Sequence, residues 1–282
     1  MTRPSLPIVP AREGLSADCS RCAGLCCVAP AFAASADFAV DKLAGTPCRH
    51  LKDDFRCGIH DRLRPEGFPG CTVFDCFGAG QRITQETFVG RSWREAPEVA
   101  AAQFAVLPVV RQLHEILWYL AEAATLPAAA ALHPAVEEAR AATERLAGLD
   151  ADGLRALDVG AHRAEVGALL QQVSDAVRTP AGPDRRGADL MGRDLRRTRL
   201  RGASLRGAYL IGADLRGMDL GTADLLGADL RGADVRGTDL SGCLFLNGPQ
   251  LQAARGDAAT RLPPGLARPP HWSSTTGPGS PR

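Results

Sequence analysis

Three features that often decide the class of a protein are scarce in this 282-residue chain. Aromatic residues make up only 5% of it, and its 33 basic residues nearly cancel its 32 acidic residues. The longest apolar run, residues 99–110, is far short of the roughly 20 residues needed to span a bilayer. We therefore expect no membrane contact and no general attraction to nucleic acid. The N-terminal Met-Thr-Arg-Pro-Ser lacks the apolar core of a signal peptide, which indicates a cytoplasmic protein.

Common catalytic motifs are missing as well. The sequence contains no P-loop, no Gly-x-Ser-x-Gly and no complete dinucleotide fingerprint. His114-Glu115 has no second histidine four residues further on, so the helical zinc pair of metalloproteases is incomplete. We expect His114 to lie on a helix surface and His162 to be solvated or packed in a core. With no catalytic constellation, a non-enzymatic protein is favoured.

What the sequence does contain is a leucine, or a substitute for one, at every fifth position of its C-terminal third. The series is Leu190, Leu195, Leu200, Leu205, Leu210, Leu215, Leu220, Leu225, Leu230, Val235, Leu240 and Phe245. Five residues turn an α-helix by about 140° beyond a full turn, so these side chains would form no stripe. On a flat strand they would alternate between faces. A chain that turns a corner once per pentad buries all of them, which predicts a solenoid.

The other positions of the pentad agree with this prediction. The residue two before each leucine is usually alanine, as a narrow interior requires, and Cys243 takes this position late in the series. The residue two after each leucine is usually glycine, which suits a tight corner. Aspartate often precedes the leucine, where its side chain can bond the local backbone.

Units such as Ala213-Asp214-Leu215-Arg216-Gly217 resemble those of the pentapeptide-repeat family. The resemblance covers residues 184–247 and implies a right-handed quadrilateral β-helix with four pentads per coil. About three coils are then expected, forming a stub roughly 14 Å tall at the usual strand spacing.

Eight of the nine cysteines lie between positions 19 and 76. They are Cys19, Cys22, Cys26, Cys27, Cys48, Cys57, Cys71 and Cys76. In a reducing compartment, such a group indicates metal ligands or redox groups more than disulfides. Cys19-x-x-Cys22 has the spacing of a metal knuckle, and the doublet Cys26-Cys27 follows within reach. His50 and His60 are alternative ligands.

The order Cys-x2-Cys-x3-Cys-Cys, followed by Cys57-Gly58-Ile59-His60 and by Arg64-Pro65 before Cys71, resembles the zinc- or iron-chelating cysteine-cluster family over residues 19–76. That resemblance implies metal binding by Cys19, Cys22, Cys26, Cys27, Cys57 and Cys71. The sequence departs from the family pattern twice. The gap from Arg-Pro to the next cysteine is longer, and His60 stands where an aromatic residue is usual.

Three interpretations of the cysteine segment follow. A structural zinc module is favoured, because closed all-thiolate sites are usually structural. Four thiolates also suit an iron–sulfur cluster. Exposed thiols of low pKa would instead form a redox or metal-transfer switch.

Residues between the cysteines and the solenoid read as helices. One is predicted from Pro97 to Ala123, with Pro108 inside it, a second from Pro134 to Gly148, and a third from a cap at Asp150 to about Arg178. Three such helices would form an antiparallel bundle. The predicted fold is thus α+β multidomain: a Cys-rich metal-binding module (1–90), a helical bundle (91–178), a β-helix (184–255) and an extended or disordered tail (256–282).

The solenoid face carries nearly balanced charge. Residues 188–242 contain nine arginines and eight aspartates. Pentapeptide-repeat proteins that imitate DNA toward topoisomerases are acidic and long, so that role is the least favoured. We expect a scaffold for an unknown protein partner, with zinc at the cysteines. An iron–sulfur or metal-handling redox protein is the alternative.

Overall fold

The computed structural model describes residues 12–274, and the chain divides at Gln172 into two compact units. The first unit, up to Gln171, contains the cysteine segment and most of the helices, and the second contains the solenoid. Among the described residues, no helix is both long and apolar enough to cross a membrane.

The cysteine segment has little regular structure. Its elements are short: η2 (Cys19–Arg21), α1 (Leu25–Val28), η3 (His60–Arg62), α2 (Pro69–Thr72), α3 (Ala79–Arg82) and the π-helix η4 (Ile83–Thr87). Single antiparallel bridges join Phe32 to Lys42 and Leu51 to Cys57. A small cluster around Ile59, Leu63 and Phe68 is buried. Short helical turns and loops therefore position the thiols.

Longer helices follow. After η5 (Pro97–Val99), the chain forms α4 (Ala100–Ala123), η6 (Pro127–Leu132), α5 (His133–Ala147), α6 (Ala151–Ala156) and α7 (Val159–Val177). The first two predicted helices are present, and α4 is one continuous element with Pro108 inside it. The Asp150 cap is confirmed, because its carboxylate accepts the N–H of Gly153 at 2.8 Å.

The prediction of a third helix is wrong in one respect, because two helices, α6 and α7, occupy its range. Leu157 leaves the helical region at ψ 127°, and the carboxylate of Asp158 then accepts the N–H of Ala161 at 3.0 Å. A second cap within the sequence restarts the chain as α7. The apolar spacing runs through the break, which is why periodicity alone did not reveal it.

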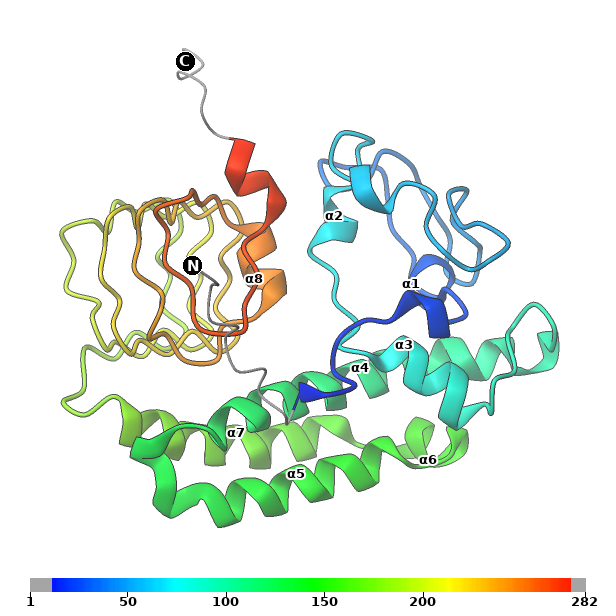
Figure 1. Cartoon of the computed structure of the whole chain (residues 1–282), viewed down its shortest axis with the longest axis horizontal. Coiled ribbons are helices and arrows are strands. Elements are labelled where there is room, and N and C mark those ends of the chain that lie inside the picture. The colour runs from blue at the N-terminus through cyan, green and yellow to red at the C-terminus, as the bar shows by residue number, and fades with distance from the viewer. Residues whose placement is uncertain (1–11, 275–282) are drawn as a thin grey trace, which may run out of the picture. The chain divides into compact units, whose positions relative to one another are not determined.

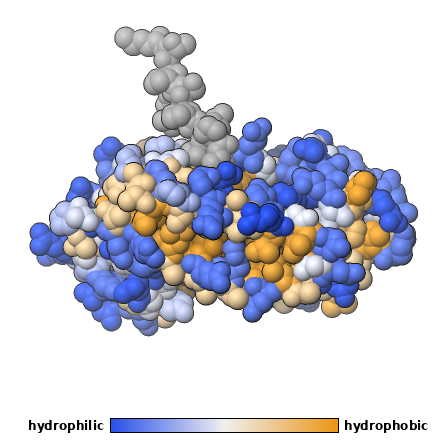
Figure 2. Space-filling view, turned by 90° about the horizontal axis from the view of Figure 1, so that it is seen from below, coloured by the Kyte–Doolittle hydropathy of each residue, from blue (hydrophilic) through white to orange (hydrophobic). Residues whose placement is uncertain are grey.

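The helix α4 forms the centre of the first unit. It packs against α3, α5 and α6, and Val110, Leu113 and Leu120 on it are fully buried. Each such side chain contributes about 1.5–3 kcal/mol through burial. From the side of α5 and α6, apolar residues appear in patches separated by polar ones (Figure 2).

The solenoid is confirmed, and its bridges join equivalent positions of successive coils. Parallel bridges pair Asp184 with Ser204, Ser204 with Asp224, and Asp224 with Leu244. Four pentads therefore complete each coil, and successive coils stack along one axis (Figure 1). Its sides consist of single-residue bridges and not of longer strands, because a corner interrupts the chain once in every pentad.

The leucines point inward as predicted. Leu205, Leu210, Leu215, Leu220 and Leu225 have no exposed surface. Cys243 is also packed inside, at 4% exposure. Corner glycines have positive φ, for example +67° at Gly217, and Asp214 accepts the N–H of Arg216 at 3.1 Å. Interior packing, corner conformation and local hydrogen bonds therefore agree along the repeat.

Beyond Phe245 the chain continues to build on the last coil. The helix α8 (Gly248–Ala253) interrupts the repeat, and Arg255 and Arg261 then pair with Asp234 and Asp239 of the coil before. Residues 256–274 of the expected tail pack on the solenoid instead of leaving it. Trp272, in η7 (Pro270–Ser274), is only 2% exposed because its ring covers Gly256. Residues 275–282 lie outside the described part.

Candidate functional sites: the cysteine segment and a histidine pocket

The structure places the eight predicted cysteines in one region but on different elements. Cys19 begins η2, the doublet Cys26-Cys27 lies on α1, and Cys71 lies on α2. The others, Cys22, Cys48, Cys57 and Cys76, are in turns and loops. All eight are free thiols that are at least partly accessible to solvent.

The effects of these thiols on one another's pKa values define two overlapping neighbourhoods, since Cys19 also acts on Cys57. In the first, burial raises the pKa of Cys22 to about 11, and the nearby Cys76 and Cys19 add to that shift. In the second, burial raises the pKa of Cys71 to about 11, and the nearby Cys27, Cys48 and Cys57 raise it further. The thiol form is favoured at both positions, so a cation that binds here must displace protons.

The doublet on α1 joins the two neighbourhoods. The Sγ atoms of Cys26 and Cys27 are 3.9 Å apart. The interaction between them raises the pKa of Cys26 and lowers that of Cys27, which is the thiol nearer to the Lys42 ammonium. Of the pair, Cys27 is therefore the easier to ionise.

Lys42 fastens the loop that carries these thiols. Its Nζ donates to the carbonyls of Val28, Leu43 and Thr46 at 2.9–3.2 Å, and the residue is 8% exposed. The ammonium also lies over the Phe32 ring, 5.5 Å from its centroid. Burial lowers the pKa of Lys42. A fixed cation beside Cys27 thus holds the segment 28–46 together from inside.

The thiols do not converge into a finished metal site. Within residues 12–274, no three His, Cys, Asp or Glu side chains lie close enough to hold one metal ion. The donors fit a thiophilic cation by chemistry, because each neighbourhood offers four sulfur atoms when Cys26 is counted with the first. Their present spacing means that binding would require local closure of these loops. His50 contacts the Phe68 ring and hydrogen-bonds Arg49, and His60 lies on η3.

A second candidate site surrounds His114, which the sequence placed on a helix surface. That prediction is wrong, because the imidazole is 2% exposed. Its Nδ1 lies 2.6 Å from the carbonyl oxygen of Phe77, which can only accept, so Nδ1 carries the proton. The buried Nε2 has no hydrogen-bond partner among the described residues. Burial lowers the pKa of His114, so the ring is neutral and Nε2 is an acceptor.

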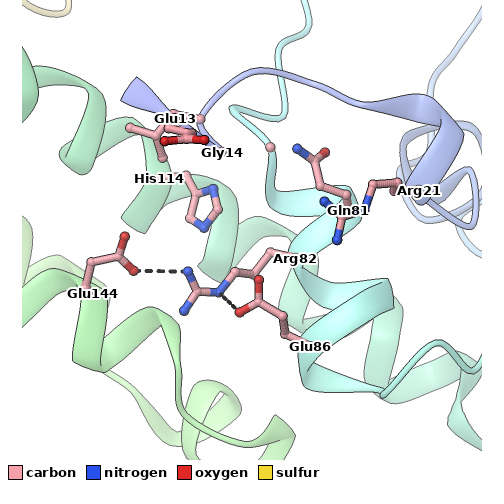
Figure 3. Close-up of a pocket in the computed structure, with 10 residues that line it drawn as sticks. Glu13, Gly14, Arg21, Gln81, Arg82, Glu86, His114 and Glu144 are labelled. Atoms are coloured by element: carbon pink, nitrogen blue, oxygen red, sulfur yellow. Dashed lines mark hydrogen bonds and ion pairs between the residues drawn. The ribbon is translucent and has the colours of Figure 1, made fainter. Parts of the chain in front are cut away.

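His114 lines a cavity of about 100 Å³ between α3, α4 and α5 (Figure 3). Arg82 crosses the cavity wall and pairs with Glu86 and Glu144, each at 3.0 Å. These two carboxylates neutralise the guanidinium. The cavity therefore offers the acceptor nitrogen of His114 together with the charged side chains of Glu13 and Arg21, which suits a water molecule or a small polar ligand.

Sequence reasoning missed this cavity for a physical reason. Its walls come from residues 13–21, 78–86, 114 and 144, which are brought together only by helix packing. The one residue in the sequence that could have indicated this packing is Gly78. A side chain there would meet the carbonyl oxygen of Gly14 at 2.0 Å, so a glycine is needed at this crossing.

The outer surface of the solenoid carries a regular ladder of ion pairs. Arg216, Arg231 and Arg236 each bind the aspartate two residues earlier at 2.6 Å. In the first coil, the hydrogen bonds from Arg196 lower the pKa of Asp194. Because most of these groups are exposed, each pair contributes little to stability. The ladder chiefly sets the charge that the surface presents.

Comparison with known proteins places these features in context. The model of the pentapeptide-repeat family matches eight copies within residues 186–221 and 208–245. The protein named "Uncharacterized protein YybG" of Bacillus subtilis (strain 168) is 53% identical over 264 residues, which are 92% of this chain and 95% of that protein.

Two solved structures are similar over part of the chain. A pentapeptide-repeat protein, Rfr23, of the cyanobacterium Cyanothece 51142 is 36% identical over 22% of this chain and 42% of its own, with a TM-score of 0.20. A pentapeptide-repeat protein of the Arabidopsis thaliana thylakoid lumen is 30% identical over 29% of this chain and 57% of its own, with a TM-score of 0.18. The chain thus spans about half the length of these two structures.

Proposed function

This chain is a pentapeptide-repeat protein of the same family as YybG of Bacillus subtilis, and from that we propose that it is a non-enzymatic cytoplasmic scaffold. In this proposal the solenoid binds a protein partner, and the cysteine segment is a module closed by a thiolate-bound cation, with zinc as the favoured metal.

The observation that carries the scaffold role is the uniform interior of the solenoid. Leucine and alanine side chains such as Leu205, Ala208 and Leu210 have no exposed surface. The interior is therefore committed to packing and leaves only the outer faces for contact. A rigid core beneath repeated polar faces is the architecture that solenoids use to bind other proteins.

The metal part of the proposal rests on the grouping of the thiols. Cys19, Cys22, Cys26 and Cys76 would hold one ion, and Cys27, Cys48, Cys57 and Cys71 a second. A bound cation would supply cross-links to a segment with little regular structure, whose buried side chains lie in a small cluster around Phe68 and at Ala23, Leu25 and Val28. Metal binding and folding of residues 19–76 would then be coupled.

Anaerobic purification followed by elemental analysis tests the module. We expect zinc at about one to two ions per chain, and a lower content in Cys71→Ser. The matched control is Cys243→Ala, which removes a thiol from the solenoid interior and should keep the full metal content. Protein free of metal under all conditions would overturn the module. A brown protein with iron and sulfide would replace zinc by an iron–sulfur cluster.

Native co-purification tests the scaffold role. We expect one protein to be retained in stoichiometric amount by the full chain and to be lost when Arg216 and Arg236 are both changed to Glu, which reverses two charges on one face. Arg145→Asp, on helix α5, is the control and should retain the partner. Turnover of a substrate that is lost in Cys19→Ser without loss of fold would overturn the proposal. Inhibition of topoisomerase supercoiling by the purified protein would instead favour the DNA-mimic role.

A further inference from the structure

The first coil of the solenoid, residues 184–203, differs in charge from the coils that follow. It contains seven arginines and three aspartates, a net charge of +4, whereas residues 204–223 are neutral and residues 224–243 carry −2. Because equivalent residues stack every 20 positions, this excess of positive charge is confined to one level of the stack. The near balance of the whole repeat conceals it.

Besides Arg185, which stands where the later coils have Leu205 and Leu225, three arginines of this coil break the repeat. Each stands 20 and 40 positions before residues of the regular pattern: Arg193 before Ala213 and Ala233, Arg197 before Gly217 and Gly237, and Arg199 before Asp219 and Asp239. The later coils show that a small residue, a glycine and an aspartate satisfy the fold at these positions. The arginines are therefore not needed for packing.

These three side chains are also exposed and without partners. Within the described residues, Arg193, Arg197 and Arg199 make no side-chain hydrogen bond or ion pair, and Arg185 of the same coil makes none either. Every other arginine of residues 184–243 pairs with an aspartate: Arg186, Arg196, Arg201, Arg206, Arg216, Arg231 and Arg236. All the unneutralised guanidinium groups of this range thus lie in the first coil.

An open depression of about 420 Å³ coincides with this positive patch. Residues 196–201 line it together with Gly217, Met218 and Asp219 of the next coil. Two of the unpaired arginines, Arg197 and Arg199, stand on its border, and Leu200 and Met218 give it an apolar part. No aromatic side chain lies in its lining.

Building on the scaffold role proposed above, we propose that this first coil docks a short acidic peptide segment of a partner protein. The planar guanidinium groups of Arg193, Arg197 and Arg199 present paired donors that match carboxylates. Successive coils are only about 4.8 Å apart, so a ligand must be thin along the solenoid axis to stay on the positive level. Nucleic acid fits this surface less well. A DNA duplex would extend over the carboxylates of Asp219 and Asp239, and a single strand would have no aromatic ring on which its bases could stack.

Fluorescence anisotropy of the full-length protein with a labelled Glu- and Asp-rich peptide tests this. We expect binding that weakens as salt is raised. The variant Arg193→Ala/Arg197→Gly/Arg199→Asp, which installs the residues of the next coil, should lose at least about tenfold in affinity with an unchanged circular dichroism spectrum. Arg199→Asp alone should lose part of it. Arg145→Asp, the same change at an arginine of α5, should lose none.

Either of two results with the acidic peptide would overturn the inference: no binding by the unaltered protein, or equal binding by the triple variant. Tighter binding of single-stranded or duplex DNA of equal charge than of the peptide would show that the occupant is nucleic acid, and would equally overturn it. If the peptide does not bind while a native partner still co-purifies with the triple variant, the scaffold role is retained and only the assignment of the docking surface is wrong.

Discussion

The guanidinium of Arg206 binds the carboxylate of Asp224, which lies on the following coil, at 2.5 Å, and this is the one ion pair of the described solenoid whose carboxylate is fully buried. At Asp214, Asp229 and Asp234, an arginine two residues after the aspartate makes the pair. Position 226 is a leucine, so Arg206 reaches Asp224 from the preceding coil, beside the Phe245 ring.

Replacing Arg206 by alanine should therefore be costly. It would leave the buried Asp224 carboxylate without its cation, and the free energy of unfolding should fall by about 3–5 kcal/mol. The control is Arg231→Ala, which breaks an exposed pair with Asp229 and should cost less than about 1 kcal/mol. Urea unfolding monitored by circular dichroism measures both. Equal losses in the two variants would contradict the special role of the buried pair.

Gly256 is predicted to be essential for the packing of the C-terminal segment. A Cβ at this position would meet the ring of Trp272 at 2.4 Å, so Gly256→Ala should displace the indole and lose about 1–3 kcal/mol through overpacking. Tryptophan emission should shift to the red, and acrylamide should quench it more strongly. In Gly248→Ala the new methyl group has no neighbour within 4 Å, and this control should leave the emission unchanged.

Stability should depend on pH through His114. Burial lowers the pKa of this side chain below its ordinary value of 6.5. At a pH between the lowered pKa of the folded state and the ordinary pKa of the unfolded state, the unfolded chain binds a proton that the folded chain does not. The free energy of unfolding therefore decreases as pH falls below about 6.5. Above that pH the contribution is fully present. Chemical denaturation between pH 7.5 and pH 5, about one unit above and one and a half units below the ordinary histidine pKa, measures the slope.

The His114→Gln variant should have a shallower slope over this range. Burial also lowers the pKa of the more exposed His162, which contacts the Thr143 hydroxyl at 2.8 Å. His162→Gln is therefore the matched comparison, with a smaller effect expected because solvent screens that ring. A slope that is unchanged in His114→Gln would contradict the assignment.

Metal binding by the cysteine segment should strengthen as pH rises. The raised pKa values of Cys22 and Cys71, each about 11, mean that protons must leave before sulfur can bind a cation. Titration with Co²⁺, followed by its thiolate absorption, should give a higher affinity at pH 8 than at pH 6.5. The gain should be of the order of tenfold or more for each displaced proton. An affinity independent of pH would indicate binding elsewhere, and Cys243→Ala should behave as the unaltered chain.

Much of the fold was predictable because its causes are local. The five-residue spacing of the leucines indicated a solenoid with an aliphatic interior, and the cap at Asp150 and the proline at 134 marked helix starts that the structure contains. The apolar spacing did not predict the break at Leu157, where one expected helix becomes two although the spacing continues. The sequence pattern also did not predict the packing of the tail, where the Trp272 ring lies against Gly256, on an earlier segment of the chain.

The cysteine segment marks the limit of sequence reasoning. The spacing of Cys19, Cys22, Cys26 and Cys27 predicts shared ions, and that stays a prediction. The influence of Cys27 and Cys48 on the pKa of Cys71 was not visible, because long loops separate these residues in the chain. The same holds for His114, since residues 13, 82 and 144 reach its cavity from separate segments.

The amino-acid sequence by itself determined the repeat, its inward side chains and its corner residues, because a short period constrains each residue through its nearest neighbours. Only the tertiary structure decided which charges are neutralised and which remain free. Pairing across coils joins residues that are remote in the chain, and they become neighbours only once the coils have stacked.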